Sequence, residues 1–243
     1  MERVFKMIGI AIACIAAVLI LAVGALAFMM KDMRAGASAA ITDGVYCIKG
    51  ARVNCYAVSA KTGFILVDAG DSLDAMKASL TALQIDPSRV ASVFLTHSDG
   101  DHTAGLPLFP NARVYLSHEE NDLVTGKKLR HLFFFSRTNH IPAPVYSLVS
   151  DGEVAVVGGT SVRAMSTPGH TPGSYSYLID GKYLYTGDSV ILIGGHMKAM
   201  GKPFTEDAAL NERTVAALKT LTDVAVLGTA HTGYTTNWDS ARR

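Results

Sequence analysis

The sequence predicts an α+β protein with two strand-rich halves, preceded by one apolar helix of membrane-spanning length. Short runs rich in β-branched and aromatic residues recur from Val45 onward, separated by turns that contain Gly, Pro, Asn or Asp. Segments with apolar residues at helical spacing interrupt these runs, and the strand-rich pattern of the first half returns in the second. The formal net charge of +1 over 243 residues does not suggest nucleic-acid binding.

The amino-terminal apolar stretch, Ile8 to Met30, contains no charged residue. At about 1.5 Å per residue, a helix of this length crosses a hydrocarbon core of roughly 30 Å. We therefore expect a flank over 1–7, a transmembrane signal anchor over 8–30, a linker over 31–40 and one globular domain over 41–243. The alternative is a cleaved signal peptide, whose apolar region is typically about 7–15 residues and thus shorter than this run.

Two small-residue sequences, Ala25-Leu26-Ala27 and Ala37-Ser38-Ala39, could serve as cleavage sites in that alternative. The flanking charges are balanced, because two basic residues lie on each side of the apolar stretch. The amino-terminal charge tips the count, so we expect a single-pass membrane protein whose globular domain lies outside the cytoplasm.

The first half of the domain reads as strands and two covering helices. Ser72 is a suitable N-cap for a helix that ends before Asp86-Pro87, and Ser117 for a second one. Cys47 and Cys55 would face each other across a three-residue hairpin loop, which leaves open either a disulfide or two free core thiols. The expected elements are strands Val45–Ile48, Val53–Ser59, Phe64–Val67, Val90–Leu95 and Asn111–Leu116, and helices Ser72–Leu83 and Ser117–Leu123.

The second half is predicted in the same way. A basic and aromatic segment, Lys127 to Phe135, precedes it; we favour a loop that packs its Phe residues into the core over a lid or a membrane-contacting patch. His118 and His196 are expected at the surface. The expected elements are strands Val145–Val149, Glu153–Val157, Ser161–Met165, Tyr183–Gly187, Val190–Gly195 and Val224–Gly228, and a helix from Glu206 to Leu221.

The segment Thr96 to Gly105 carries the densest chemistry of the chain. It places His97, Asp99, Asp101 and His102 within six positions, directly after an apolar strand. Four such side chains in one loop would repel one another and lose hydration, and a bound cation compensates for both costs. Three later candidates each follow a strand-like run and a small-residue turn: His170, Asp188 and His231.

This order, His-x-Asp-x-Asp-His followed by Gly-His, Gly-Asp and a late His, resembles the metallo-β-lactamase fold metallo-hydrolase superfamily. Val53 to Tyr56 and Leu66 to Gly70 are similar to the opening strands of that family. The resemblance covers nearly everything after the amino-terminal segment. It implies an αββα sandwich of two mixed β-sheets with flanking helices, and metals at one edge between the sheets.

The resemblance also implies a ligand set, carried over residue by residue. One ion would be bound by His97, Asp99 and His170, the other by Asp101, His102 and His231, and Asp188 would bridge them. The usual motif has His where this chain has Asp99, and a hard carboxylate oxygen shifts the preference of that position from zinc toward manganese or iron. Two divalent ions are expected, with zinc as the first choice and manganese or iron as alternatives.

Two further carboxylates have expected roles. Asp101 is the candidate catalytic residue, which would orient the hydroxide and move a proton. Asp68 resembles the family carboxylate that positions metal ligands, with capping of the following loop as the alternative role.

The expected function is a membrane-anchored metal-dependent hydrolase that acts on a small-molecule substrate. A metal-bound hydroxide would cleave an ester, thioester, lactone, amide or phosphoester bond. The alternative from another class is an iron-dependent oxidoreductase of the same fold, toward which Asp99 points. A non-catalytic binding module is the weakest alternative, because unpaired ligands would repel one another.

Overall fold

The computed structural model describes residues 2–31, 33–132, 135–143 and 145–243. The chain forms two compact units, Met1–Met33 and Arg34–Arg243. The first unit is helix α1, Glu2–Met30. Its stretch Phe5–Ala25 has a mean hydropathy of 2.8 and is the one segment among the described helices that is long and apolar enough to cross a membrane. A signal sequence near the amino terminus can meet the same criteria of length and hydropathy.

The second unit contains a seven-stranded mixed sheet built from the first half of the domain. Its strands lie in the order β1-β2-β3-β4-β5-β6-β9. The pairs from β1 to β4 are antiparallel, and those from β4 to β9 are parallel. The strands are β1 Ala39–Thr42, β2 Val45–Lys49, β3 Asn54–Ala60, β4 Gly63–Val67, β5 Val90–Phe94, β6 Arg113–Ser117 and β9 Ser147–Val149.

A six-stranded mixed sheet from the second half faces the first, in the order β10-β11-β12-β13-β16-β17. Only β13 and β16 pair in parallel among these described strands. The strands are β10 Val154–Val157, β11 Thr160–Ser166, β12 Tyr175–Ile179, β13 Tyr183–Tyr185, β16 Val226–Thr229 and β17 Gly233–Thr235. Two separate hairpins are formed by β7 Arg130–Leu132 with β8 Phe135–Arg137, and by β14 Val190–Ile193 with β15 His196–Ala199.

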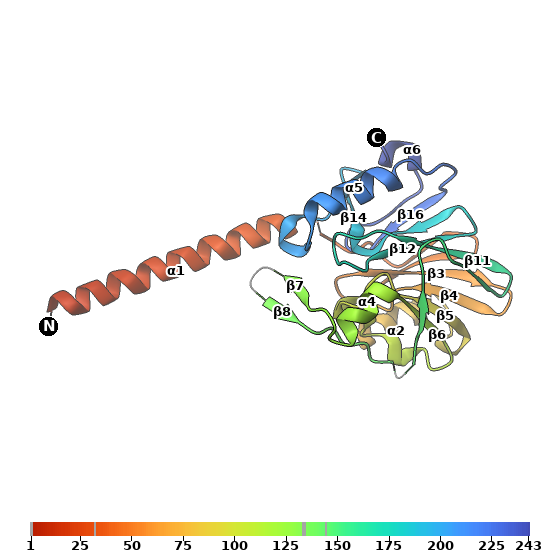
Figure 1. Cartoon of the computed structure of the whole chain (residues 1–243), viewed down its shortest axis with the longest axis horizontal. Coiled ribbons are helices and arrows are strands. Elements are labelled where there is room, and N and C mark those ends of the chain that lie inside the picture. Colours follow the sequence, from red (N-terminus) through yellow and green to blue (C-terminus); the bar gives the residue numbers. More distant parts are fainter. Residues whose placement is uncertain (1, 32, 133–134, 144) are drawn as a thin grey trace. The chain divides into compact units, whose positions relative to one another are not determined.

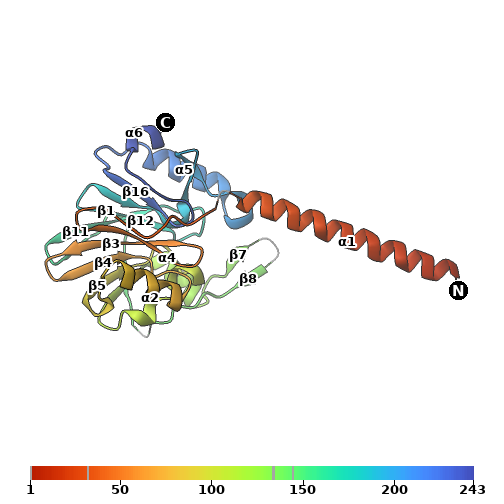
Figure 2. The same cartoon turned by 180° about the vertical axis from the view of Figure 1, so that it is seen from behind.

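Helices cover the outer face of each sheet (Figure 1). Figure 2 shows the same four layers from behind. Apolar side chains of α2 pack on the first sheet, those of both sheets fill the space between them, and those of α5 and α6 pack on the second sheet. The helices of this unit are α2 Leu73–Ala82, α3 Gly100–Thr103, α4 His118–Val124, α5 Ala208–Leu218 and α6 Trp238–Ala241.

These layers confirm the predicted αββα sandwich with two mixed sheets. The predicted caps are also present: Ser72 accepts a hydrogen bond from the Ala75 amide and Ser117 one from the Glu120 amide. Contacts with the globular domain begin inside the segment 31–40, which we expected to be a linker. Strand β1 starts at Ala39, and the Gly36 amide donates a hydrogen bond to Asn54 Oδ1 at 2.7 Å.

The predicted pairing of the two strand cysteines is wrong. Cys47 lies opposite Tyr56 and Cys55 opposite Ile48, so the register differs by one residue from the one that a three-residue loop would give. Because neighbouring strand residues point to opposite faces, Cys47 joins the core between the sheets and Cys55 the core beneath α2. Both are free, buried thiols.

Candidate metal centre

The predicted ligands lie at the carboxyl ends of strands from both sheets. The loop after β5 carries His97 and Asp99, and the short helix α3 carries Asp101 and His102. His170 follows β11, Asp188 lies in a 3-10 turn after β13, and His231 follows β16. Ends of strands in packed sheets meet at one edge, and this brings residues from four separate segments together.

Glycine geometry permits the close approach of two of these segments. Gly187 has a φ of +51°, and a β-carbon there would lie 2.3 Å from the Thr96 hydroxyl oxygen. Only glycine therefore lets the turn that carries Asp188 pack against the segment Thr96 to Gly105, which we call the motif loop. Gly169, with a φ of +136°, lies against the α5 backbone at Asn211, and this contact fixes the loop that carries His170.

Two groups of side chains could each hold a metal ion: His97, His170 and Asp188, and Asp101, His102 and His231. Asp188 lies between the groups. Its Oδ1 is 3.3 Å from His102 Nε2, and its Oδ2 is 3.5 Å from His170 Nε2 and 3.3 Å from His231 Nε2. Asp101 Oδ2 lies 3.7 Å from His231 Nε2 and 4.0 Å from His102 Nε2.

Several of these buried polar atoms fit a cation and little else. His97 Nε2, His102 Nε2 and Asp188 Oδ1 are buried and make no hydrogen bond of acceptable geometry among the described residues, although the last two atoms lie 3.3 Å apart as an ion pair. A buried polar atom without a hydrogen bond costs free energy, so three of them in one small region favour a bound ligand. Imidazole nitrogens and carboxylate oxygens are the ligands that zinc and similar divalent ions prefer.

The charges of the site depend on one another. Burial alone would lower the pKa of His102, but Asp68, Asp188 and Asp101 outweigh that effect and raise it well above its usual value. Burial would raise the pKa of Asp188, yet His231, His102 and His170 hold it well below its usual range. Asp188 thus stays ionised and is stabilised by a positive partner, which a divalent ion supplies more strongly than protonated imidazole.

Asp68 contacts both the loop after β5 and the His102 imidazole. Its backbone is left-handed, with a φ of 62°. One carboxylate oxygen, Oδ1, accepts the Thr96 amide at 2.8 Å, and the other, Oδ2, lies 2.8 Å from His102 Nδ1. The carboxylate therefore caps the motif loop and contacts the imidazole edge that faces away from the ligand group.

Asp99 is the predicted ligand with the most unusual surroundings. Its Oδ2 lies 3.6 Å from both His97 Nε2 and His170 Nε2, close to the first group. Protein donors also surround the carboxylate: Arg130 Nε at 3.2 Å, Arg137 Nη2 at 3.2 Å and Asn139 Nδ2 at 2.9 Å. Although burial opposes ionisation, the pKa of Asp99 lies far below its usual range because His170, His97 and Arg130 stabilise the anion.

Sequence reasoning missed Arg130. It belongs to the basic and aromatic segment, of which Phe133 and Phe134 lie outside the described residues, so the prediction that the Phe residues pack into the core is not tested there. Lys127 and Lys128 are exposed and pair with Asp122, whereas the Arg130 side chain is completely buried. A basic residue next to two lysines gives no sequence signal of burial.

Glu120 was also missed, since its position in a run of acidic residues gives no sequence signal of burial. It is fully buried, and its carboxylate accepts from the Ser98 amide at 2.8 Å and from the hydroxyls of Ser98 and Thr171. It thereby ties the motif loop to the loop that carries His170. The Ser117-x-x-Glu120 spacing is that of a capping box. A capping box would have predicted that the Glu120 side chain accepts the Ser117 amide, which is not the contact described here.

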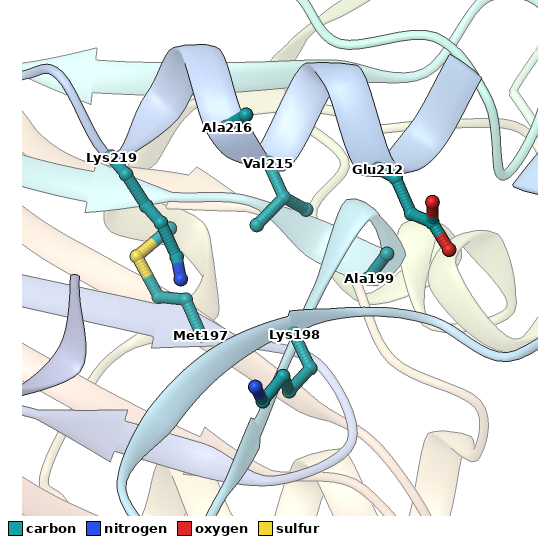
Figure 3. A pocket seen from close by; sticks show the side chains of 7 residues that line it. All are labelled: Met197, Lys198, Ala199, Glu212, Val215, Ala216 and Lys219. Atoms are coloured by element: carbon teal, nitrogen blue, oxygen red, sulfur yellow. The ribbon is translucent and has the colours of Figure 1, made fainter. Parts of the chain in front are cut away.

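His118, His196 and one surface hollow lie outside the two groups of candidate ligands. His118 and His196 are exposed, as expected. A hollow of about 190 Å³ lies between β15 and α5, lined by Met197, Lys198, Ala199, Glu212, Val215, Ala216 and Lys219 (Figure 3). None of these residues belongs to the candidate metal centre.

The αββα layers, with a cluster of candidate metal ligands at the edge between the sheets, are the arrangement expected of a metal-dependent hydrolase. A family model described as the metallo-beta-lactamase superfamily matches residues 48–242. The chain belongs to that superfamily, which confirms the resemblance seen in the sequence.

Three individual proteins to which the chain is similar share less than 30% sequence identity with it. The chain is 27% identical over 150 residues to an atrochrysone carboxyl ACP thioesterase of Cryptosporiopsis, covering 61% of this chain and 41% of that protein. It is 29% identical over 129 residues to a hydroxyacylglutathione hydrolase of Rhodopseudomonas palustris, covering 51% and 44%. The chain thus spans less than half the length of either. A metallo-beta-lactamase structure from Cronobacter sakazakii shares the fold with a TM-score of 0.63, at 23% identity over 84% of this chain and 81% of that one.

Proposed function

We propose that this chain is a membrane-anchored metal-dependent hydrolase of a small-molecule substrate. The observation that carries the proposal is the convergence of the two ligand groups on Asp188, whose two oxygens face imidazoles of both groups. The bond class includes ester, thioester, lactone, amide and phosphoester. We place thioesters first, because two relatives are named for hydrolysis of acyl carrier protein and acylglutathione substrates.

Divalent ions bound here would lower the pKa of a coordinated water and polarise the scissile bond. Asp188 would lie between the ions, and the remaining imidazoles and carboxylates would complete their shells. We assign Asp99 to the first group with His97 and His170. Zinc is the metal that we propose, since imidazole dominates the ligand set.

Asp101 is placed to handle protons. Its side chain is 32% exposed, whereas those of Asp99 and Asp188 are 8% and 5% exposed. A carboxylate at the more exposed side of the cluster can accept a proton from an attacking water and exchange it with solvent. Asp68 would hold the His102 ring so that Nε2 faces the ligand group.

The oxidoreductase alternative depended on Asp99 as a hard ligand for iron. Both oxygens of that carboxylate accept hydrogen bonds from protein donors, so it is a weaker ligand than an unengaged carboxylate. The hydrolase is therefore the better supported function. Elemental analysis separates the two, because zinc or manganese supports the hydrolase and iron the alternative.

The test uses the full chain, purified in detergent with an affinity tag that contains no histidine. Acyl thioesters, aryl esters, lactones and phosphoesters are assayed before and after removal of metal by a chelator. Asp188→Ala should lose metal and at least about 10²-fold in activity, since it removes the carboxylate shared by both groups. His118→Ala is the control and should match the wild type. Full activity in the chelated protein or in Asp188→Ala would overturn the proposal.

A further inference from the structure

Arg130 lies inside the candidate metal centre, with its guanidinium bonded through all three nitrogens. Nε donates to Asp99, and Nη1 donates to Glu206 Oε1 at 2.9 Å and to the His131 carbonyl at 3.3 Å. Nη2 donates to the Phe204 carbonyl at 3.2 Å and lies 3.3 Å from His170 Nε2. Glu206 also accepts the His131 amide at 2.9 Å, so the guanidinium is fixed from two sides.

The contact with His170 has a chemical consequence. A guanidinium can only donate, so His170 Nε2 must accept through its lone pair. That nitrogen is the one nearest to Asp99 and Asp188. The same lone pair would be needed to bind an ion, and Arg130 therefore competes with a metal for this ligand.

The other imidazoles of the two groups are not engaged in this way. His97 Nε2 and His102 Nε2 have no hydrogen-bond partner among the described residues. The Asp68 carboxylate lies at His102 Nδ1, which favours the tautomer whose Nε2 lone pair is free. Of the first group, Asp99 and His170 are thus bonded to Arg130, whereas none of the described contacts of Arg130 is with Asp101, His102, His231 or Asp188.

We propose that Arg130 makes the two metal positions unequal. The position with Asp101, His102 and His231 keeps its ion through purification. The position with His97, Asp99 and His170 fills only at higher metal concentration, when the guanidinium releases His170. This inference rests on the proposed metal-dependent function, and Arg130 acts in it as a positioning residue.

The test is a titration of the metal-free full chain with Zn²⁺ against a chromophoric chelator, followed by metal-to-protein ratios after dialysis. In the wild type we expect two dissociation constants at least 100-fold apart and about one ion per chain after dialysis. Arg130→Met should tighten the weaker step at least tenfold. Arg130→Met combined with Glu206→Gln should do the same, because it leaves no unpaired carboxylate at Glu206.

Arg137→Met is the matched control. Arg137 also donates to Asp99, but it is 55% exposed and has no described contact with His170. Because Arg137→Met keeps the contact between Arg130 and His170, its weaker dissociation constant should tighten by no more than threefold. Near-ultraviolet circular dichroism reports whether each variant is folded, and the wild-type titration tests the inference even if the Arg130 variants do not fold.

The outcomes separate this inference from the function on which it depends. Two ions bound by the wild type with similar affinity would overturn the role of Arg130 and leave the hydrolase proposal intact. A weaker first position in a folded Arg130→Met chain would also overturn it, since Arg130 would then be holding Asp99 in place as a ligand. A wild-type chain that binds no metal would contradict the proposed function itself.

Discussion

Replacing Asp68 with Asn would separate its capping role from its contact with His102. The two side chains have the same shape, and Asn tolerates the left-handed backbone of this position. The carboxylate offers one oxygen to the Thr96 amide and the other to His102 Nδ1, both at 2.8 Å. An amide has only one acceptor oxygen, so the variant can serve only one of these two donors.

The consequence follows from the position of the imidazole proton. If the amide oxygen of the variant faces the Thr96 backbone, its NH₂ faces His102 Nδ1, which must then accept. The proton moves to Nε2, and Nε2 no longer has a lone pair for a metal. If the amide is turned the other way, the buried Thr96 amide loses its acceptor and the motif loop is destabilised instead.

Both orientations weaken metal binding. Loss of a carboxylate partner behind a ligating imidazole typically costs 10–100-fold in metal affinity, which corresponds to about 1.4–2.7 kcal/mol. A lost hydrogen bond to a charged group is worth about 1.5–3 kcal/mol, a range of the same size. We therefore expect the tighter zinc dissociation constant of Asp68→Asn to rise 10–100-fold.

The assay is a competition titration of the metal-free chain with a chelator of known affinity. Asp180→Asn is the control, because Asp180 also has a left-handed backbone and accepts a backbone amide, that of Ser161, but it is exposed. The control should bind zinc like the wild type. An Asp68→Asn chain whose zinc affinity stays within twofold of the wild type would refute the assigned role of Asp68.

Two further expectations concern the thiols and the amino-terminal helix. Burial raises the pKa of Cys47 to about 12, so iodoacetamide at pH 8 should label neither Cys47 nor Cys55 in the native chain and both in urea, without prior reduction. Labelling that requires a reductant would instead reveal a disulfide. The full chain should stay in the pellet after alkaline carbonate extraction of membranes, with an unprocessed amino terminus by mass spectrometry. A mature chain that begins near Ala27 or Ala39 would show a cleaved signal sequence.

Alternation and spacing in the sequence predicted many of the strands and helices, and the resemblance to the family implied their layers. Strand and helix periods, Ser72 and Ser117 as caps and the position of Pro87 depend on local chemistry, and the elements predicted from them agree with the structure within a few residues at their ends. The strands β1, β7, β8, β12, β15 and β17 and the helix α6 were not predicted. The candidate ligands were also visible, because each lies directly after a strand-like run. Adjacent strand ends collect such residues whatever the details of packing.

Features that depend on register or on distant contacts were not accessible in this way. One additional residue in the β2–β3 loop places Cys47 and Cys55 on opposite faces, and nothing in the local sequence distinguishes that loop length. Glu120 and Arg130 look like surface residues in their charged neighbourhoods, yet both are buried against segments about 20 to 80 positions away.

The sequence by itself determined the family, the four-layer fold and the set of His and Asp residues available to a metal, since all three follow from residue type and order along the chain. Only the tertiary structure decided how those residues are engaged. The hairpin of β7 and β8 brings the buried Arg130 guanidinium to Asp99 and His170. Asp68 contacts Nδ1 of His102. These contacts join residues far apart in the chain, and local periodicity carries no information about them.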